Sequence, residues 1–170
     1  MYCNTDASNC YRGQYVTYGG ARQAIGAIDS EPEHPGNLTT IYSRKRLPRA
    51  WDNGVTWNRE HIFPQSYMSQ PNDEAGADYS DLHALFPEIP NVNSARGNSY
   101  FGRCLPSQAA VHGVCTSPAH PLAAPDTAKS ALMFLPPVAV RGDIARAVFY
   151  MALRYGSNQP RSSTRMHASQ

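Results

Sequence analysis

An alternating stretch that runs into a proline constrains the fold of this chain more than any other feature. Val55 and Trp57 alternate before polar residues take over, a pattern that predicts a strand leading into a site. Neighbouring residues of a strand point to opposite faces, so Glu60 and His61 can share one small site only where the strand ends or bends. Pro64 supplies that ending, because proline has no backbone N–H for a ladder. We therefore expect a strand that ends in a polar site.

Length and hydropathy predict one domain and no membrane span. The chain has 170 residues, enough for one domain with a real core and short for two. Apolar residues make up 41% of it, its mean hydropathy is -0.49, and no apolar run approaches the about 18 residues that a span requires. We expect a soluble monomer without a membrane partner.

The charge of the chain leaves its partner open. The net charge is +2, which is too small to indicate a polyanionic partner by itself, but the chain has 13 arginines and only two lysines. Arginine suits bidentate phosphate contacts, and a GC-rich coding sequence would give the same bias. The basic run at 44–49, RKRLPR, is predicted to be a solvated loop in preference to a nucleic-acid contact.

The cysteines favour disulfides over a metal site. Cys3, Cys10, Cys104 and Cys115 form two locally spaced pairs without a CxxC pattern, which makes structural zinc the less favoured reading. Of the three possible connectivities we favour Cys3 with Cys10 and Cys104 with Cys115, and hence an oxidising compartment. The opening residues show neither the basic start nor the apolar stretch of a signal peptide, so a leader is either missing or was never there.

Local patterns predict short elements separated by turn-forming segments. The expected elements are a helix over 19–29, strands over 38–43, 54–63 and 81–87, a loop over 64–80, a helix over 91–98 with Asn or Ser caps and an end at Gly97, an extended surface excursion over 103–137, and a disordered tail over 157–170.

The segment RGDIARAVFYMALRYG gives the clearest helix, over 141–155. Asp143 is expected to cap it and Gly156 to end it. Its core face is predicted to comprise Ile144, Val148 and Met151, flanked by Phe149 and Tyr155. This is the pattern of an ordinary core helix.

Residues between 55 and 98 have the chemistry of phosphodiester hydrolysis. That reaction needs a base for water, a cation at the departing oxygen and a positive group on the phosphate. His61 can be the base, and the oxygens of Glu60 and Asn93 are hard ligands suited to Mg²⁺. Taken singly, these residues are better explained without catalysis: Glu60 as a surface salt-bridge partner, His61 as a satisfied polar residue and Asn93 as a helix cap.

Three separated segments carry a family resemblance. They read, in chain order, WNREHIFPQS, DLHALFPEIPNVNSARGNSYFG and VRGDIARAVFYMALRY. Together they resemble the bacterial endonuclease I family of secreted and periplasmic nucleases, over roughly residues 40–156. The resemblance implies an α+β single domain over 1–156 with mixed short strands and helices, and a ββα-metal finger at about 55–98.

The resemblance also implies roles at matching positions. Glu60 corresponds to the metal carboxylate, His61 to the general base and Asn93 to the second metal ligand. His83, in the DLH motif, corresponds to a site position on the second strand that supports the finger. The expected metal is Mg²⁺, with Mn²⁺ or Ca²⁺ as alternatives.

An arginine that holds the scissile phosphate is a family feature without a direct counterpart in this sequence. Relatives use an arginine there, but the loop between the two finger strands contains none. Arg96 or Arg59 is therefore expected in its place. Arg96 has a competing interpretation as the partner of Asp81 or Glu88.

Three departures from the family pattern carry expectations of their own. Ala84 replaces a polar residue next to the site, and Leu135 stands where an acidic residue is usual in relatives. We therefore expect fewer polar groups around the site and reduced activity. Residues 157–170 match nothing of the family's usual ending, which predicts lost packing of several kcal/mol, about the stability margin of a domain.

The resemblance predicts a metal-dependent endonuclease of low sequence preference. Its substrate would be DNA, with RNA as a second substrate, and its products would carry 5′-phosphates. Secretion or a periplasmic location is expected from the cysteines and the family. Two other classes stay open: a nucleic-acid-binding module that no longer cuts, and a secreted domain stapled by disulfides with a structural role.

Overall fold

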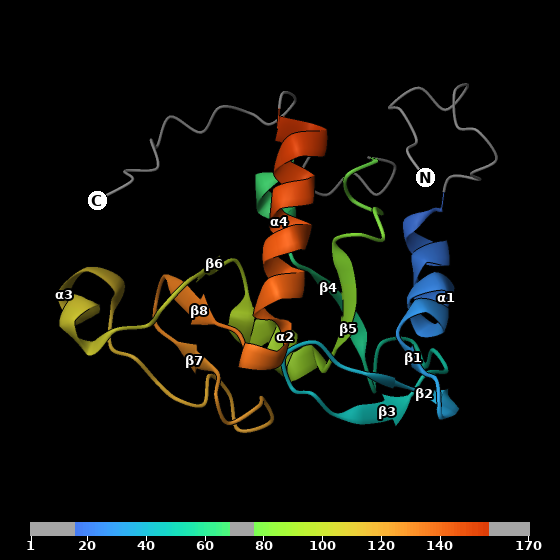
Figure 1. Ribbon diagram of the computed structural model, residues 1–170, viewed down its shortest axis with the longest axis horizontal. Helices are drawn as coiled ribbons and strands as arrows, with labels where there is room; N and C mark the ends of the chain where they lie inside the picture. Colours follow the sequence, from blue (N-terminus) through green and yellow to red (C-terminus); the bar gives the residue numbers. More distant parts are fainter. Residues whose placement is uncertain (1–15, 69–76, 157–170) are drawn as a thin grey trace.

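The computed structural model describes residues 16–68 and 77–156 (Figure 1). The helices are α1 (Tyr18–Ile28), α2 (Pro90–Arg96), α3 (Ala109–His112) and α4 (Arg141–Tyr155). The strands are β1 (Ser30–Glu31), β2 (His34–Thr39), β3 (Arg46–Pro48), β4 (Asn58–His61), β5 (Leu85–Glu88), β6 (Tyr100–Phe101), β7 (Ala128–Lys129) and β8 (Met133–Leu135). This mixture of helices and small sheets confirms the predicted α+β class.

The strands of the described residues form three small sheets. β1, β2 and β3 are antiparallel neighbours, and β4 pairs with β5 antiparallel, with Glu60 opposite Phe86 and His61 opposite Leu85. In the third sheet β8 lies between β6, which runs parallel to it, and β7, which runs antiparallel. α1 packs against β5, and α2 packs against β4. Sheet and helix thus meet at β4 and β5.

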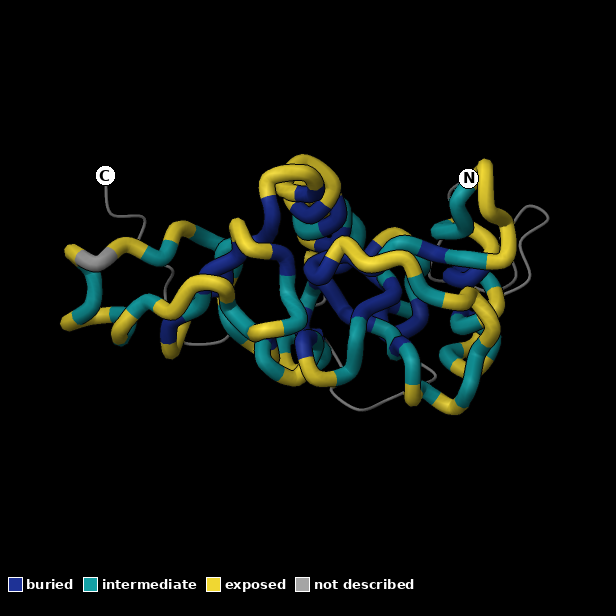
Figure 2. Tube along the Cα trace, turned by 90° about the horizontal axis from the view of Figure 1, so that it is seen from below, coloured by how far each residue is buried: buried dark blue, intermediate teal, exposed yellow. Residues whose placement is uncertain are grey.

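Buried residues gather in the middle of the molecule, whereas the end near α3 is exposed or half-buried (Figure 2). The main core joins Tyr42, Ile62 and Val92 to Phe134 and to Ile144 of α4. Two smaller clusters lie under α1 and under the last turns of α4. Burial of this apolar area is the main force that holds the short strands in place.

Both long helices occur where the sequence predicts them. Thr17 caps α1, with its hydroxyl accepting from Gly20 N at 3.1 Å. In α4, Ile144, Met151 and Tyr155 are buried, Val148 is half-buried against the core and Phe149 is 66% exposed. The predicted Asp143 cap is wrong: a 3₁₀ turn at Val138–Val140 runs directly into the helix, and Asp143 instead pairs with Arg146 in the first turn.

Two predictions in the 34–48 region are wrong. The strand expected over 38–43 is β2, which ends at Thr39, because the chain turns where Thr40 accepts from Lys45 N at 2.9 Å. Arg44 takes a positive φ of 52° in this turn. The basic run is a strand in part, since β3 pairs with β2 through Leu47. Arg46 of β3 still faces water, as the solvated interpretation expects.

The 103–137 segment is only partly the surface excursion that was expected. It contributes β7 and β8, and Phe134 lies fully buried in the main core because β8 is the central strand of its sheet. The predicted Cys104–Cys115 disulfide is present, with Cα atoms 5.7 Å apart. The predicted Cys3–Cys10 pair and the predicted tail over 157–170 lie outside the described residues. Within 16–68 and 77–156, no helix is long and apolar enough to span a bilayer.

Candidate active site

The predicted finger region folds as two antiparallel strands followed by a helix. β5 is separated from α2 by Ile89 alone, and Pro90 at the first helical position has a φ already suited to a helix. Ile89 caps α2 without a side-chain hydrogen bond, so the predicted Asn or Ser cap is wrong. Gly97 ends α2 at φ 54°, as expected of a glycine there. α2 thereby lies alongside β4.

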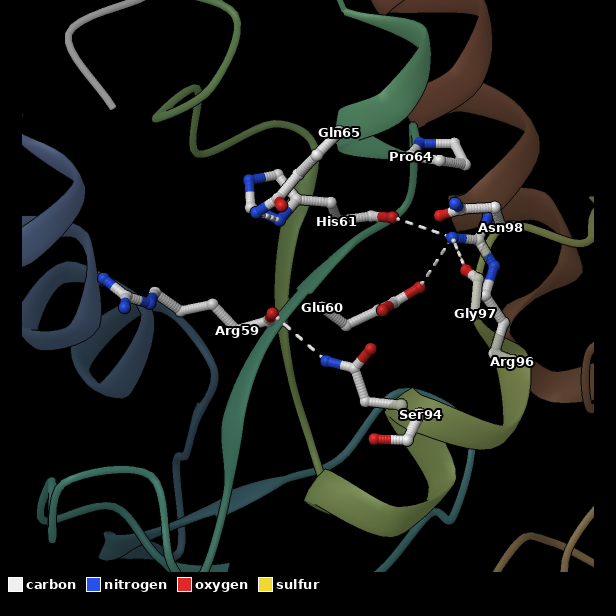
Figure 3. A pocket seen from close by; sticks show the side chains of 10 residues that line it. Arg59, Glu60, His61, Pro64, Gln65, Ser94, Arg96, Gly97 and Asn98 are labelled. Atoms are coloured by element: carbon white, nitrogen blue, oxygen red, sulfur yellow. Dashed lines mark hydrogen bonds and ion pairs between the residues drawn. The ribbon is translucent and has the colours of Figure 1, made fainter. Parts of the chain in front are cut away.

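A cavity of about 240 Å³ opens where β4 ends beside α2 (Figure 3). It is lined by Arg59, Glu60, His61, Pro64, Gln65, Asn93, Ser94, Arg96, Gly97 and Asn98. Five of the six residues singled out from the sequence therefore line one cavity, and His83 does not. The five come from β4 and α2, and β5 lies between these two elements in the sequence.

Glu60 is a buried carboxylate held through one oxygen. Its Oε1 accepts from the hydroxyl of Tyr42 at 2.7 Å and lies 3.2 Å from Nη1 of Arg96. Burial raises the pKa of Glu60 to about 7, and the nearby Arg96 and the Tyr42 hydrogen bond act in the opposite direction. No hydrogen bond from the described residues reaches Oε2. That oxygen is available to a ligand.

Asn93 is oriented by hydrogen bonds from its amide nitrogen. Nδ2 donates to Oδ1 of Asn58 at 2.7 Å and to the carbonyl of Arg59 at 3.2 Å. The amide oxygen, on the other side of the same planar group, is directed away from both acceptors. Asn58 and Glu60 are two residues apart and share a face of β4. The Asn93 amide therefore lies on the face of β4 from which Glu60 projects.

His61 projects from the opposite face of β4. Its ring lies 5.5 Å from that of Tyr18 and 5.0 Å from that of Tyr79. Nε2 lies 2.8 Å from the carbonyl of Tyr79, which can only accept, so Nε2 carries the hydrogen and Nδ1 holds the lone pair. Gln65 donates to Nδ1 at 3.1 Å. Burial lowers the pKa of His61 to about 4, so the imidazole is neutral near pH 7.

Glu60 and His61 share a cavity although they point to opposite faces, because β4 ends at His61. The chain bends at Ile62 and Phe63 and enters a 3₁₀ turn at Gln65–Tyr67 directly after Pro64. The end of a strand is open on both faces. The expectation that the strand ends before Pro64 is confirmed.

Arg96 is buried, with 2% of its surface exposed. Besides Glu60, its guanidinium donates to the carbonyls of His61 at 3.1 Å and Gly97 at 3.0 Å (Figure 3). It also donates to the carbonyl of Ile62 at 2.9 Å. Its expected alternative partners, Asp81 and Glu88, are not the ones it contacts. Arg96 thus holds the end of β4 against the end of α2.

Arg59 extends to the other side of β4 from Arg96 (Figure 3). Its guanidinium lies 3.4 Å from the ring centroid of Tyr18 and 5.3 Å from that of Trp51, and it donates to the carbonyl of Tyr18. The residue as a whole is half-buried. Of the two arginines in the cavity wall, Arg59 is the more exposed.

His83 lies before β5, so the prediction that it sits on the second strand is wrong. Its side chain is 61% exposed, and Nδ1 lies 2.9 Å from Oδ1 of Asp81. The ring stacks on Tyr150 of α4 at 4.3 Å. Ala84, next to it, is fully buried in the cluster under α4 and is not part of the cavity wall.

Three residues of the site were missed from the sequence. Tyr42 and Gln65 contact Glu60 and His61 directly. Glu88 accepts from the backbone N–H groups of Tyr42, Ser43 and Ile89, and so ties the turn that carries Tyr42 to the start of α2. Gln65 and Glu88 left a sequence signal, since they lie within the first and second motifs, whereas Tyr42 lies in none of the three.

The donor set fits a hard divalent cation. Oε2 of Glu60 and the amide oxygen of Asn93 are two oxygen donors on one face of β4, and Mg²⁺ is commonly held by one or two carboxylates and several waters. Among the described residues no group of three His, Cys, Asp or Glu side chains that could hold a metal ion gathers.

A family model and two relatives match the chain. The model for Endonuclease I matches residues 2–170. An extracellular ribonuclease of Bacillus amyloliquefaciens is 30% identical over 142 residues, and one of Bacillus subtilis (strain 168) is 29% identical over 142 residues. Each alignment covers 82% of this chain and 44% of the relative, so the chain spans less than half the length of these proteins.

The family match is longer than the resemblance seen in the three motifs. It extends from residue 2 to residue 170 and so includes 157–170, which corrects the expectation that the ending is unrelated to the family.

Proposed function

The chain belongs to the endonuclease I family, and we propose that it is a metal-dependent nuclease that hydrolyses phosphodiester bonds inside DNA or RNA chains. One observation carries the proposal. A neutral imidazole whose Nδ1 can accept a hydrogen bond and two hard oxygen donors line the same cavity from opposite faces of β4. Those are the groups that activation of water beside a phosphate requires.

His61 is proposed as the general base. The Tyr79 carbonyl fixes the hydrogen on Nε2, and burial keeps the ring neutral, so Nδ1 can accept a proton from water near pH 7. Gln65 occupies Nδ1 in this structure. A water that enters the cavity would replace the Gln65 amide as the hydrogen-bond donor to Nδ1.

Glu60 and Asn93 are proposed as the ligands of Mg²⁺, with Mn²⁺ or Ca²⁺ as alternatives. When bound, the cation would stabilise the negative charge that develops on the departing oxygen. Arg96 and Tyr42 keep Oε1 of Glu60 fixed, which leaves Oε2 for the ion. The products would carry 5′-phosphates.

Arg59 is proposed as the phosphate-holding arginine, and Arg96 as a positioning residue. Arg96 already donates to three carbonyls and pairs with Glu60, so a phosphate would compete with four internal acceptors. Arg59 makes one such bond and is half-buried. His83 is proposed to support the region around β5 from outside the cavity.

The substrates and location follow from the relatives and the disulfide. The Bacillus proteins are named extracellular ribonucleases, which supports RNA beside DNA as substrate and supports action outside the cytoplasm. The Cys104–Cys115 bond suits an oxidising compartment. Contacts through phosphate predict little sequence preference. The domain of 1–156 and the monomeric state remain part of the proposal.

The test is cleavage of supercoiled plasmid and of a long RNA by the wild-type chain and by His61→Ala. Both are assayed with Mg²⁺ and with EDTA, at equal folded concentration judged by circular dichroism. We expect the variant to lose about 10²-fold or more in rate, the usual contribution of a general base. We expect EDTA to abolish cutting by the wild type.

His34→Ala is the matched control, because His34 lies exposed on β2 away from the cavity. It should cut at the wild-type rate. Equal rates for wild type and His61→Ala would refute the assignment of the base. A folded wild type that binds nucleic acid without cutting it would support the binding module instead, and one that does neither would support the structural domain.

A further inference from the structure

Two tyrosine rings stack on each other beside the cavity. The rings of Tyr67 and Tyr100 have centroids 5.6 Å apart and an interplanar angle of 7°. Tyr100 remains 49% exposed although one face of its ring is covered by Tyr67. About half of Tyr100 is therefore in contact with water, and its exposed apolar surface is one that a stacking ligand could cover.

The backbone on both sides of the stack is fixed. Tyr100 begins β6, where its N–H donates to the carbonyl of Leu132 at 2.8 Å and where it pairs with Met133 of β8. Tyr67 closes the 3₁₀ turn at Gln65–Tyr67 and packs its ring against that of Phe63 at 6.4 Å. Rings held in this way lose little conformational entropy when a ligand stacks on them.

The stack borders the cavity through two residues of its wall. Gln65 and Asn98 both line the cavity (Figure 3), and each precedes one of the two tyrosines by two positions. Two residues span at most about 7 Å of chain. The hydroxyl of Tyr67 also donates to the carbonyl of Asn98 at 3.5 Å. A nucleotide next to one whose phosphate occupies the cavity can reach the stack.

We propose that Tyr100, backed by Tyr67, forms a subsite for an unpaired nucleobase, and that the preferred substrate is single-stranded nucleic acid. The inference rests on the proposed nuclease function. An unpaired base has a free π-face that stacks on an aromatic side chain, whereas the bases of a duplex are already stacked on their neighbours. Stacking tolerates every base, so the subsite adds strand selectivity without sequence selectivity.

The first test measures binding in the His61→Ala background, so that the strand survives. Labelled short single strands with all bases present are compared with strands that carry an abasic site at successive positions, by fluorescence anisotropy. Tyr100→Leu should weaken binding of the complete strand by about 5- to 150-fold, the range for loss of one stacked base. It should leave the strand with the relevant abasic site unaffected.

Two further variants separate the ring from its surroundings. Tyr100→Phe keeps the stacking surface and should bind the complete strand within about 3-fold of the parent. Phe149→Ala removes an aromatic ring of similar exposure from α4 and should change nothing. If Tyr67 and Tyr100 serve only to hold the 3₁₀ turn against β6, Tyr100→Leu will weaken the complete and abasic strands equally, and the proposal fails.

The second test compares kcat/KM for a single strand and for the duplex of the same sequence in the otherwise wild-type chain. We expect a preference for the single strand that Tyr100→Leu reduces through KM. Equal kcat/KM values for the two substrates would overturn the inference. A wild-type chain that binds strands in a base-dependent manner but does not cut them would refute the nuclease function and leave the subsite standing.

Discussion

At the scale of single residues, Glu60 owes its position to side chains that are distant in sequence. Tyr42 and Arg96 both contact Oε1, and Glu88 holds the turn from which Tyr42 projects. Neither contact follows from any periodic pattern, because they join a turn, a strand end and a helix end. The cavity therefore depends on the packing of the main core, to which Tyr42 belongs.

Tyr42→Phe removes one hydrogen bond from Glu60 and keeps the ring in the core. A hydrogen bond to a charged group contributes about 1.5–3 kcal/mol, so we expect weaker Mg²⁺ binding by roughly 10- to 150-fold in calorimetry and a lower thermal midpoint. Tyr155→Phe is the matched control, because Tyr155 also donates to a carboxylate, that of Asp81, outside the cavity. Mg²⁺ affinity that falls equally in both variants would show that the Tyr42 effect is only a loss of stability.

His83→Ala tests whether the DLH motif acts in the chemistry. The His83 ring stacks on Tyr150 and pairs with Asp81, and it lies outside the cavity wall. We expect nuclease activity within about 3-fold of wild type and a stability loss of about 1 kcal/mol or less, as for exposed pairs. Urea unfolding and plasmid nicking on the same preparation measure both. A hundredfold loss of cutting by a stable variant would place His83 in the reaction after all.

The residues that carry chemistry were predictable in part. Glu60, His61 and Asn93 stand in short motifs, and the structure brings them to one cavity. Arg96 was found, but its burial and its pairing with Glu60 were not, since its neighbours in sequence gave no sign of them. Tyr67 and Tyr100 were not singled out, because a ring stack between segments far apart in sequence leaves no local pattern.

At the scale of elements, the sequence pattern predicts the helices better than the short strands. The spacing of apolar residues predicts α1 and α4 well, because helix burial repeats every 3.6 residues. The strand predicted over 38–43 lies several residues too late in the sequence compared with β2, because the three residue pairs that β2 forms with β3 decide where β2 ends. β7 and β8 were missed for the same reason: short strands exist through their partners.

Asp29, at the C-cap of α1, gives a pH-dependent prediction. Burial raises its pKa to about 6, and Arg44 opposes this only in part. The unfolded chain ionises Asp29 near its ordinary value of 3.8, so the folded state binds the extra proton between that value and about 6, and stability falls as the pH rises through this window. A negative charge at the last turn of a helix adds to the cost.

Asp29→Asn removes that charge. We expect little change in the free energy of unfolding below pH 4 and a gain of about 1–2 kcal/mol above pH 6.5, after allowance for the partial exposure of the group. Urea unfolding over this pH range measures the difference. A constant difference at all pH values would contradict the assigned cause.

At the scale of the whole molecule, cationic side chains continue beyond the cavity. A second hollow of about 230 Å³ is lined by Arg22, Arg49 and Trp51 among others. Arg59 joins the two, since it lines the first cavity while its guanidinium faces Trp51, as does that of Arg22 at 5.8 Å. The chain has 13 arginines and two lysines, so arginine supplies most of its positive side chains.

The salt dependence of binding tests this cationic path. Each arginine that neutralises a phosphate releases counterions, so the slope of log K against log salt changes by about 0.7 to 0.9 per contact. For Arg22→Gln with Arg49→Gln in the His61→Ala background, we expect weaker binding of a short strand at low salt and a slope shallower by about 1.5. Arg146→Gln, an exposed arginine on α4, is the control and should keep the wild-type slope. An unchanged slope in the double variant would show that the bound strand does not run over Arg22 and Arg49. The strand would then extend from the cavity past the Tyr67–Tyr100 stack instead.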